Sequence, residues 1–123
     1  MAAEPSYPKR GCVYYIQFDP SIGHEIRKTR PAVVVSNDHM NELSATILVM
    51  PITGGHYGYY HWIPLQPPEG GMNKPSSIVT EQIRCVDKRR VKRRLGTLAT
   101  KTMRKIEDAI RDHCDLPEGN VLP

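Results

Sequence analysis

Runs of apolar residues separated by short polar segments dominate the first half of the chain and predict β-strands. Residues 11–19 are rich in aromatic and β-branched side chains, a composition typical of a strand. Residues 32–37 form a continuous apolar run, which predicts a strand buried on both faces. Residues 44–53 form a second run of this type, and Pro51 near its end predicts a bulge or an edge position.

Three further elements follow from the same pattern. The polar residues 38–43 predict one helical turn, which Asn37 or Asp38 would cap. Residues 62–66 predict a short edge strand, because the proline in this segment lacks the N–H that a central strand needs. Residues 77–87 predict another strand, whose polar side chains share one face: Thr80, Gln82 and Arg84.

The last periodic segment of the chain predicts an amphipathic helix over residues 99–116. Either Thr100 or Thr102 is expected to cap its N-terminus. Its side chains recur at helical spacing in an apolar stripe that consists of Met103, Ile106, Ile110 and either His113 or Cys114.

The segments between these elements predict loops within a single domain. Residues 20–31 are charged and have proline at both ends, and residues 54–61 are rich in glycine and tyrosine. We expect flexible tails at residues 1–9 and 117–123 around one domain of residues 10–116. Five or six short strands and one C-terminal helix predict an α+β fold, mainly β, in which a small curled sheet or barrel packs against the helix.

The composition narrows the class of protein. Hydrophobic residues make up 39% of the 123 residues and charged residues 24%, which is enough apolar material for a buried core. The net charge is +4, and eleven basic against six acidic side chains fall in residues 84–123, so the whole surplus lies there. A surplus of this size permits a polyanionic partner. No apolar run is long enough to cross a bilayer, so no membrane partner is expected.

The cysteines and histidines predict neither a metal nor a cofactor. The three cysteines lack the CxxC spacing of zinc sites, and the five histidines lack HxxxH or HxH spacing. The cysteines are therefore interpreted as buried small hydrophobes in a reducing cytosol, and the protein is expected in the cytoplasm.

Chemistry is expected where two loops meet. If residues 32–37 and 44–53 pair as an antiparallel hairpin, Arg30 and Thr53 lie at the same open end. Arginine offers a fixed fork of donors for phosphate oxygens and stays charged, so this pair suits phosphate chemistry. The tyrosine-rich loop after Thr53 suits stacking on unpaired bases. The alternative is that Arg30 is a solvated surface residue and that Thr53 is only a strand former.

An ordered set of motifs resembles a known family. The chain contains, in this order, GCVYYIQFDPSIGHEIRKTRPAVVVSND, VMPIT and IVTEQIRCVDKRRV. The set is similar to the MazF/PemK toxins of bacterial toxin–antitoxin systems, over nearly the whole chain. The resemblance implies a compact SH3-like β-barrel and a homodimer with an RNA groove at its interface. A cognate antitoxin protein would block this groove.

The resemblance also implies an activity. It is metal-independent cleavage of single-stranded mRNA at a short sequence, in which the 2′-OH attacks the adjacent phosphate. The products would carry 2′,3′-cyclic phosphate and 5′-OH ends. Carried over by position, Arg30 would stabilise the charged phosphorane, and Thr53 would hydrogen-bond a non-bridging oxygen or position the 2′-OH. Glu25 would be a candidate general base.

The same resemblance and the two loops supply the residues expected to contact RNA. These are His24, Lys28, His56, Tyr57, His61, Ser77, Glu81 and Gln82. Cys12 stands where relatives usually have aspartate, and we expect a structural role there. Two other functions stay open: a CcdB-like toxin that poisons DNA gyrase through a protein contact, and a non-catalytic module that binds single-stranded RNA.

Overall fold

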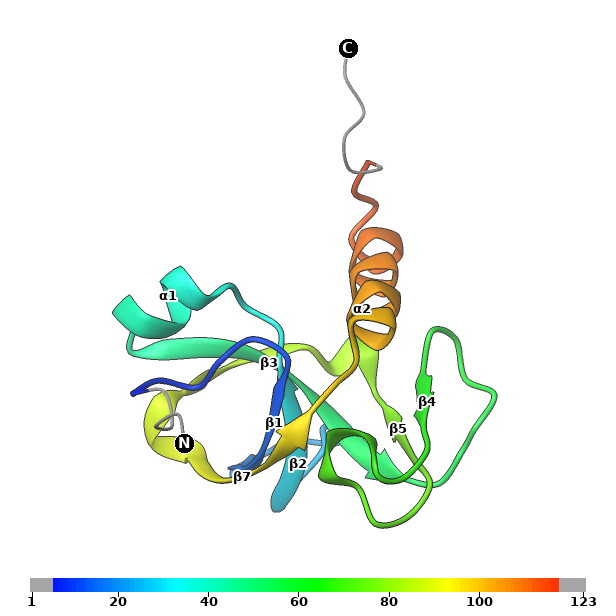
Figure 1. Ribbon diagram of the computed structural model, residues 1–123, viewed down its shortest axis with the longest axis horizontal. Coiled ribbons are helices and arrows are strands. Elements are labelled where there is room, and N and C mark those ends of the chain that lie inside the picture. The colour runs from blue at the N-terminus through cyan, green and yellow to red at the C-terminus, as the bar shows by residue number, and fades with distance from the viewer. Residues whose placement is uncertain (1–5, 118–123) are drawn as a thin grey trace.

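The fold is built on one antiparallel sheet, seen in a computed structural model that describes residues 6–117 (Figure 1). Within these residues seven strands are present: β1 (Cys12–Gln17), β2 (Thr29–Val34), β3 (Thr46–Gly54), β4 (Ile63–Leu65), β5 (Ser76–Ile78), β6 (Arg84–Asp87) and β7 (Val91–Thr97). Their order is β4-β5-β3-β2-β1-β7, and β6 pairs with β3 beside this path. The predicted α+β class, mainly β, is confirmed, with seven strands instead of five or six.

The helices make up a smaller part of the fold than the strands. The structure has α1 (Asp38–Leu43), α2 (Thr100–His113) and three single 3-10 turns, η1 (Glu69–Gly71), η2 (Thr80–Gln82) and η3 (Lys88–Arg90). The predicted cap of α1 is confirmed, because the Asn37 side chain accepts from the Met40 N–H at 2.8 Å. No helix of the described chain is long and apolar enough to cross a membrane.

The predicted cap of α2 is wrong. The N-cap residue is Ala99, and the capping carboxylate comes from η1, far away in sequence. Glu69 Oε2 accepts from the Ala99 N–H at 3.0 Å and from the Thr102 hydroxyl at 2.6 Å. This carboxylate satisfies a free N–H of the first turn, so the cap is tertiary and leaves no local signal. The buried face of α2 consists of Thr102, Met103, Ile106 and Ala109, while Cys114 is exposed.

One predicted strand and one predicted loop are also corrected. Residues 77–87 do not form one strand, because η2 interrupts them between β5 and β6. Thr80 is fully buried there, and its hydroxyl donates to the His61 carbonyl at 2.9 Å. The predicted loop over residues 20–31 ends earlier, because Thr29, Arg30 and Pro31 belong to β2.

Pro51 lies inside β3, and the predicted bulge or edge position is wrong. On one side of β3, residues 46–49 pair with β6 and residues 52–54 pair with β5. Pro51 falls at this change of partner, where its carbonyl accepts from the Val79 N–H at 2.9 Å. A residue without an N–H is tolerated at such a point, since no ladder bond needs it.

Two hydrophobic clusters cover the two faces of the sheet. Alternate side chains of β1 enter different clusters: Val13 packs with Ile106 of α2, while Tyr14 and Ile16 pack with Phe18. Strand β2 and the residue after it divide in the same way, which explains why residues 32–35 are continuously apolar. Burial of one such aliphatic side chain stabilises the fold by about 1.5–3 kcal/mol. Cys12 is buried in the second cluster, in agreement with a structural role, whereas Cys85 and Cys114 are exposed, so the prediction of burial is wrong for these two cysteines.

Only part of each predicted tail can be compared with the structure. Residues 1–5 and 118–123 lie outside the described residues. Within the described part, the Lys9 carbonyl accepts from the Cys12 N–H at 3.0 Å, so the order of the chain begins before β1.

Gly71 permits a close approach of η1 to β7. Its φ is +78°, and a Cβ there would lie 2.1 Å from the Leu95 carbonyl oxygen. We therefore expect Gly71→Ala to lower the free energy of unfolding by about 2–4 kcal/mol, because the backbone must move. Chemical denaturation measures this loss. The matched control is Gly23→Ala, with φ +61° and no atom within 4 Å, for which the expected loss is about 1 kcal/mol. Equal losses would contradict a steric role for Gly71.

Candidate active site

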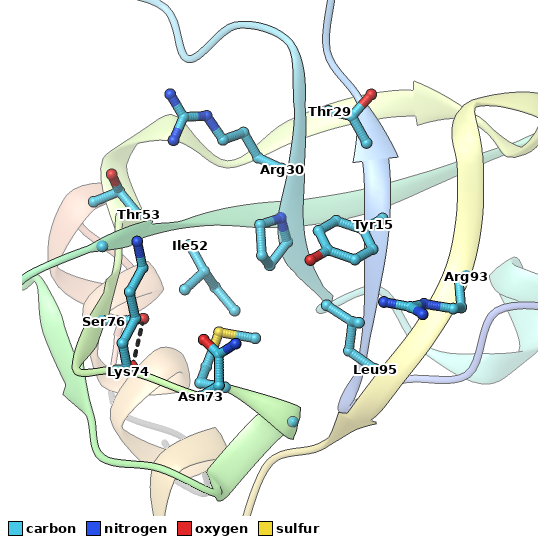
Figure 2. Close-up of a pocket in the computed structure, with 14 residues that line it drawn as sticks. Tyr15, Thr29, Arg30, Ile52, Thr53, Asn73, Lys74, Ser76, Arg93 and Leu95 are labelled. Carbon is cyan, nitrogen blue, oxygen red and sulfur yellow. Dashed lines mark hydrogen bonds between the residues drawn. The ribbon is translucent and has the colours of Figure 1, made fainter.

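The β2–β3 hairpin brings Arg30 and Thr53 together, as the sequence predicts. Ala32 pairs with Pro51, Val33 with Met50 and Val34 with Val49. Continuing this antiparallel register by two residues places Thr53 opposite Arg30. Both side chains line the same pocket, from neighbouring strands (Figure 2).

This pocket has a volume of about 300 Å³, and we call it the cationic pocket. It lies between the ends of β2, β3 and β5 and the strands β1 and β7. Its lining residues are Tyr15, Thr29, Arg30, Pro31, Ile52, Thr53, Gly54, Gly71, Met72, Asn73, Lys74, Ser76, Arg93 and Leu95. Three of them are cations and none is a carboxylate, so the pocket suits an anion.

The guanidinium of Arg30 is available to a ligand. Its Nε donates to the Arg27 carbonyl at a long 3.4 Å, which fixes the stem of the side chain. No carboxylate within residues 6–117 forms an ion pair with it, and the residue is exposed. Its terminal N–H groups therefore remain free for phosphate oxygens.

Lys74 is a pocket residue that the sequence analysis missed. It comes from the turn before β5, and Figure 2 shows its ammonium beside Thr53. A Cβ on Gly54 would lie 3.1 Å from Lys74 Cε, so the glycine after Thr53 leaves room for this side chain. The paired glycines after Thr53 are the available sequence signal, but they do not name the lysine.

Glu25 does not line the cationic pocket. Its carboxylate accepts from the Ile22 N–H at 2.6 Å and so closes a turn within the loop before β2. Lys28 ends that loop with a φ of +66°, and its carbonyl accepts from the Phe18 N–H. The Lys28 side chain is exposed, and it too lies outside the lining of the pocket.

Gln82 holds this loop in place. Its Oε1 accepts from the Ile26 N–H at 2.9 Å, and its Nε2 donates to the His24 carbonyl at 3.3 Å. Both ends of the amide are thus occupied by the chain itself. In this structure Gln82 positions the loop that leads to Arg30, and its amide is not free to read a base.

A second pocket gathers other predicted RNA-binding residues. Its volume is about 650 Å³, and its lining consists of His24, Tyr59, Tyr60, Trp62, Glu81, Gln82 and His113. The Trp62 indole N–H donates to Glu81 Oε1 at 2.7 Å, and the Tyr59 and Trp62 rings lie 4.7 Å apart. Tyr57 stacks on Tyr59 at 5.6 Å. Half-exposed aromatic rings beside a carboxylate can accept an unpaired base.

His56 and Ser77 instead form hydrogen bonds that hold the beginning of the tyrosine-rich loop. His56 Nε2 lies 3.1 Å from the Leu65 carbonyl oxygen. Ser77 is 1% exposed, and its hydroxyl donates to the Gly55 carbonyl at 2.7 Å. The prediction that Ser77 contacts RNA is therefore corrected to a structural role, because its hydroxyl is buried and already bonded.

Asp112 of α2 anchors the tyrosine-rich loop. The Tyr60 hydroxyl donates to its carboxylate, and His61 Nε2 lies 3.1 Å from the same oxygen. The hydrogen bond to Asp112, with some loss of hydration, raises the pKa of Tyr60 above its ordinary 10.0. The bond from Tyr60, aided by the charge of His61, holds the pKa of Asp112 below its ordinary value. His61 is thus tied to the helix and has a φ of +58°.

The raised pKa of Tyr60 and the lowered pKa of Asp112 predict the pH range over which the tyrosine-rich loop stays in contact with α2. A raised tyrosine pKa means that the contact is present below pH 10 and is lost as the pH rises through that raised value. A lowered aspartate pKa means that it is lost as the pH falls through that lowered value. In an absorbance titration of phenolate, we expect Tyr60→Phe to remove a component that ionises above pH 10. Tyr59→Phe, the control, should keep that component, and its survival in Tyr60→Phe would contradict the assignment.

Comparisons with known proteins show which solved structures share this fold. A MazF from Deinococcus radiodurans has the same fold, with a TM-score of 0.79 at 20% identity, over 90% of this chain and 99% of that one. An endoribonuclease in complex with its cognate antitoxin, from Mycobacterial species, matches with a TM-score of 0.74 at 22% identity, over 90% and 98% of the two chains. The sheet with its C-terminal helix therefore has the fold of the MazF toxins.

Sequence similarity defines the family. The model of the PemK-like, MazF-like toxins of type II toxin–antitoxin systems matches residues 9–114. The Endoribonuclease MazF of Staphylococcus saprophyticus is 35% identical over 104 residues, which cover 83% of this chain and 87% of that protein. The chain belongs to the PemK/MazF-like toxin family.

Proposed function

We propose that this chain is a toxin endoribonuclease that cleaves single-stranded mRNA at a short specific sequence. The observation that carries the proposal is that Arg30 and Thr53, from neighbouring strands, line one pocket with three cations and no carboxylate. Such a pocket attracts a phosphodiester and stabilises the extra negative charge of a pentacoordinate phosphorane. The relative of 35% identity is itself an endoribonuclease by name.

The reaction we propose needs only the RNA and the groups in the pocket. The 2′-OH attacks the adjacent phosphorus, the bond to the 5′-oxygen breaks, and the products are a 2′,3′-cyclic phosphate and a 5′-OH. Arg30 and Lys74 neutralise the charge that develops on the non-bridging oxygens. The Thr53 hydroxyl donates to one of these oxygens and fixes the phosphate for in-line attack. The protein's cations supply this charge stabilisation, so the reaction is proposed to be metal-independent.

The proposal gives no step to Glu25. A general base must reach the proton it abstracts, directly or through one water. The Glu25 carboxylate is bonded to the Ile22 N–H and does not line the cationic pocket. The 2′-OH proton is therefore assigned to solvent at the open side of the pocket, and a water molecule supplies the proton that the departing 5′-oxygen takes up.

The proposal extends to partners and place of action. We propose that the toxin acts as a homodimer in the cytoplasm, where mRNA is found, and that a cognate antitoxin neutralises it. Solved structures of similar fold support the antitoxin partner, since they include a MazE–MazF structure from Deinococcus radiodurans and a mycobacterial endoribonuclease in complex with its cognate antitoxin.

Incubation of the purified protein with a long single-stranded RNA in EDTA tests the function. We expect cuts at one short sequence, unchanged when Mg²⁺ replaces EDTA. Intact RNA would contradict the endoribonuclease proposal. Retention of the intact RNA by the protein would then favour a non-catalytic binding module, and inhibition of DNA gyrase without RNA binding would favour a protein-targeting toxin.

A further inference from the structure

Arg93 is set apart from the basic run in which it lies. Most cations of residues 88–94 are bonded to their own chain: Lys88 to the Glu42 carbonyl, Arg89 to Asp87, Arg90 to the Gln17 carbonyl and Lys92 to the Arg89 carbonyl. Arg93 instead lies over the Tyr15 ring, with its guanidinium carbon 5.4 Å from the ring centroid. The structure gives its N–H groups no acceptor within residues 6–117.

A β-bulge directs Arg93 to this position. In the β1–β7 ladder, Ile16 pairs with Val91 and Tyr14 pairs with Arg94, so two β7 residues face Tyr15 alone. A bulge of this kind re-aims a side chain and is frequent beside active sites. Here it brings the Arg93 side chain to the wall of the cationic pocket.

The pocket separates Arg93 from the residues assigned to the reacting phosphate. Figure 2 shows its guanidinium entering from β7, with Tyr15 between it and Arg30, while Lys74 lies on the far side beside Thr53. The Tyr15 ring orients the guanidinium through a cation–π contact, which leaves the N–H fork free. A pocket of about 300 Å³ is at the small end of ligand sites, so it accommodates one nucleotide unit between the two positions.

We propose that Arg93, seated on Tyr15, is a second phosphate subsite that binds the phosphate adjacent to the scissile one. The inference rests on the proposed endoribonuclease function and deepens it. One nucleotide of single-stranded RNA lies across the pocket, with its reacting phosphate at Arg30 and Thr53 and its neighbouring phosphate at Arg93. The second contact sets the register of the strand and thereby holds the reacting phosphate in place.

Arg93→Gln tests the subsite, with Lys92→Gln as the matched control. Lys92 carries the same charge on the same strand but does not line the cationic pocket. For Arg93→Gln we expect KM to rise by about 10- to 100-fold, because one charged contact to a phosphate is lost. The value of kcat should change little, because this contact is equally strong in the bound substrate and in the transition state. The slope of log KM against log salt should fall by about 0.7, the value for one phosphate of a single strand. Lys92→Gln should change KM by less than about 3-fold.

Neutral linkages in the RNA identify the phosphate. Two oligonucleotides carry a methylphosphonate, one on each side of the scissile linkage. Wild type and Arg93→Gln should cleave one of the two oligonucleotides with the same KM, because the charged phosphate that Arg93 binds is already missing from it. A KM of Arg93→Gln equal to wild type on natural RNA, or a penalty that persists with both oligonucleotides, would overturn the subsite. Absence of cleavage by wild type would instead overturn the proposed function itself.

Discussion

Arg30→Ala is expected to lower kcat/KM for RNA cleavage by on the order of 10³-fold or more, the largest effect of any single substitution in this chain. Arg30 faces the pocket without a carboxylate partner in the described chain, and Thr53 lies opposite it. Removal of its guanidinium leaves the extra charge of the phosphorane with fewer donors. Because the reacting phosphate gains charge only in the transition state, most of the loss should fall on kcat.

Arg27→Ala is the matched control for Arg30→Ala. Arg27 is an exposed arginine of the same loop, its side chain donates to the Gly23 carbonyl, and it does not line the cationic pocket. We expect it to retain cleavage within about 3-fold, as for removal of one exposed charge. Both variants should unfold at the wild-type temperature, since neither residue belongs to a core cluster. Arg30→Ala with cleavage near wild type would contradict the assignment.

Thr53→Val is expected to lower kcat by about 10²-fold, the loss of one donor to the developing oxyanion. Valine keeps the β-branched shape of threonine, so β3 and its partners should be unchanged. Thr53→Ser restores the hydroxyl and should recover most of the activity. Single-turnover cleavage with saturating protein measures kcat free of product release.

Thr46→Val supplies the control at the other end of β3. Thr46 pairs with Asp87, far from the cationic pocket, and its hydroxyl lies 3.2 Å from that of Ser44. We expect cleavage at the wild-type rate. If Thr53→Val also cleaves at that rate, the Thr53 hydroxyl has no part in the reaction.

The sequence predicts the centre of the site because that part depends on local order. Two apolar runs joined by a short polar helix can pair in essentially one antiparallel way, and that pairing places Arg30 beside Thr53. The burial of β2 on both faces follows from its continuous apolar run in the same manner. The order of the motifs also predicts the family, and the match of the family model to residues 9–114 confirms this prediction.

The rest of the site depends on contacts between distant segments. Lys74 reaches Thr53 from a turn that sequence patterns identify only as polar, and Arg93 enters the pocket through a bulge that leaves no local signature. Gln82 lies on η2, where a buried Thr80 interrupts what alternation predicts to be a strand. The carboxylate of Glu25 is occupied by a nearby backbone N–H, which motif position alone does not reveal.

A single substitution in the RNA tests the central claim, that the cationic pocket promotes attack by the RNA's own 2′-OH. Two oligonucleotides contain the mapped cut site, and one has a 2′-deoxynucleotide immediately before the scissile phosphate. In EDTA we predict cleavage of the all-ribose strand to a 2′,3′-cyclic phosphate and a 5′-OH, and no cleavage of the deoxy strand at that linkage. Cleavage of the deoxy strand at the rate of the all-ribose strand would contradict the account.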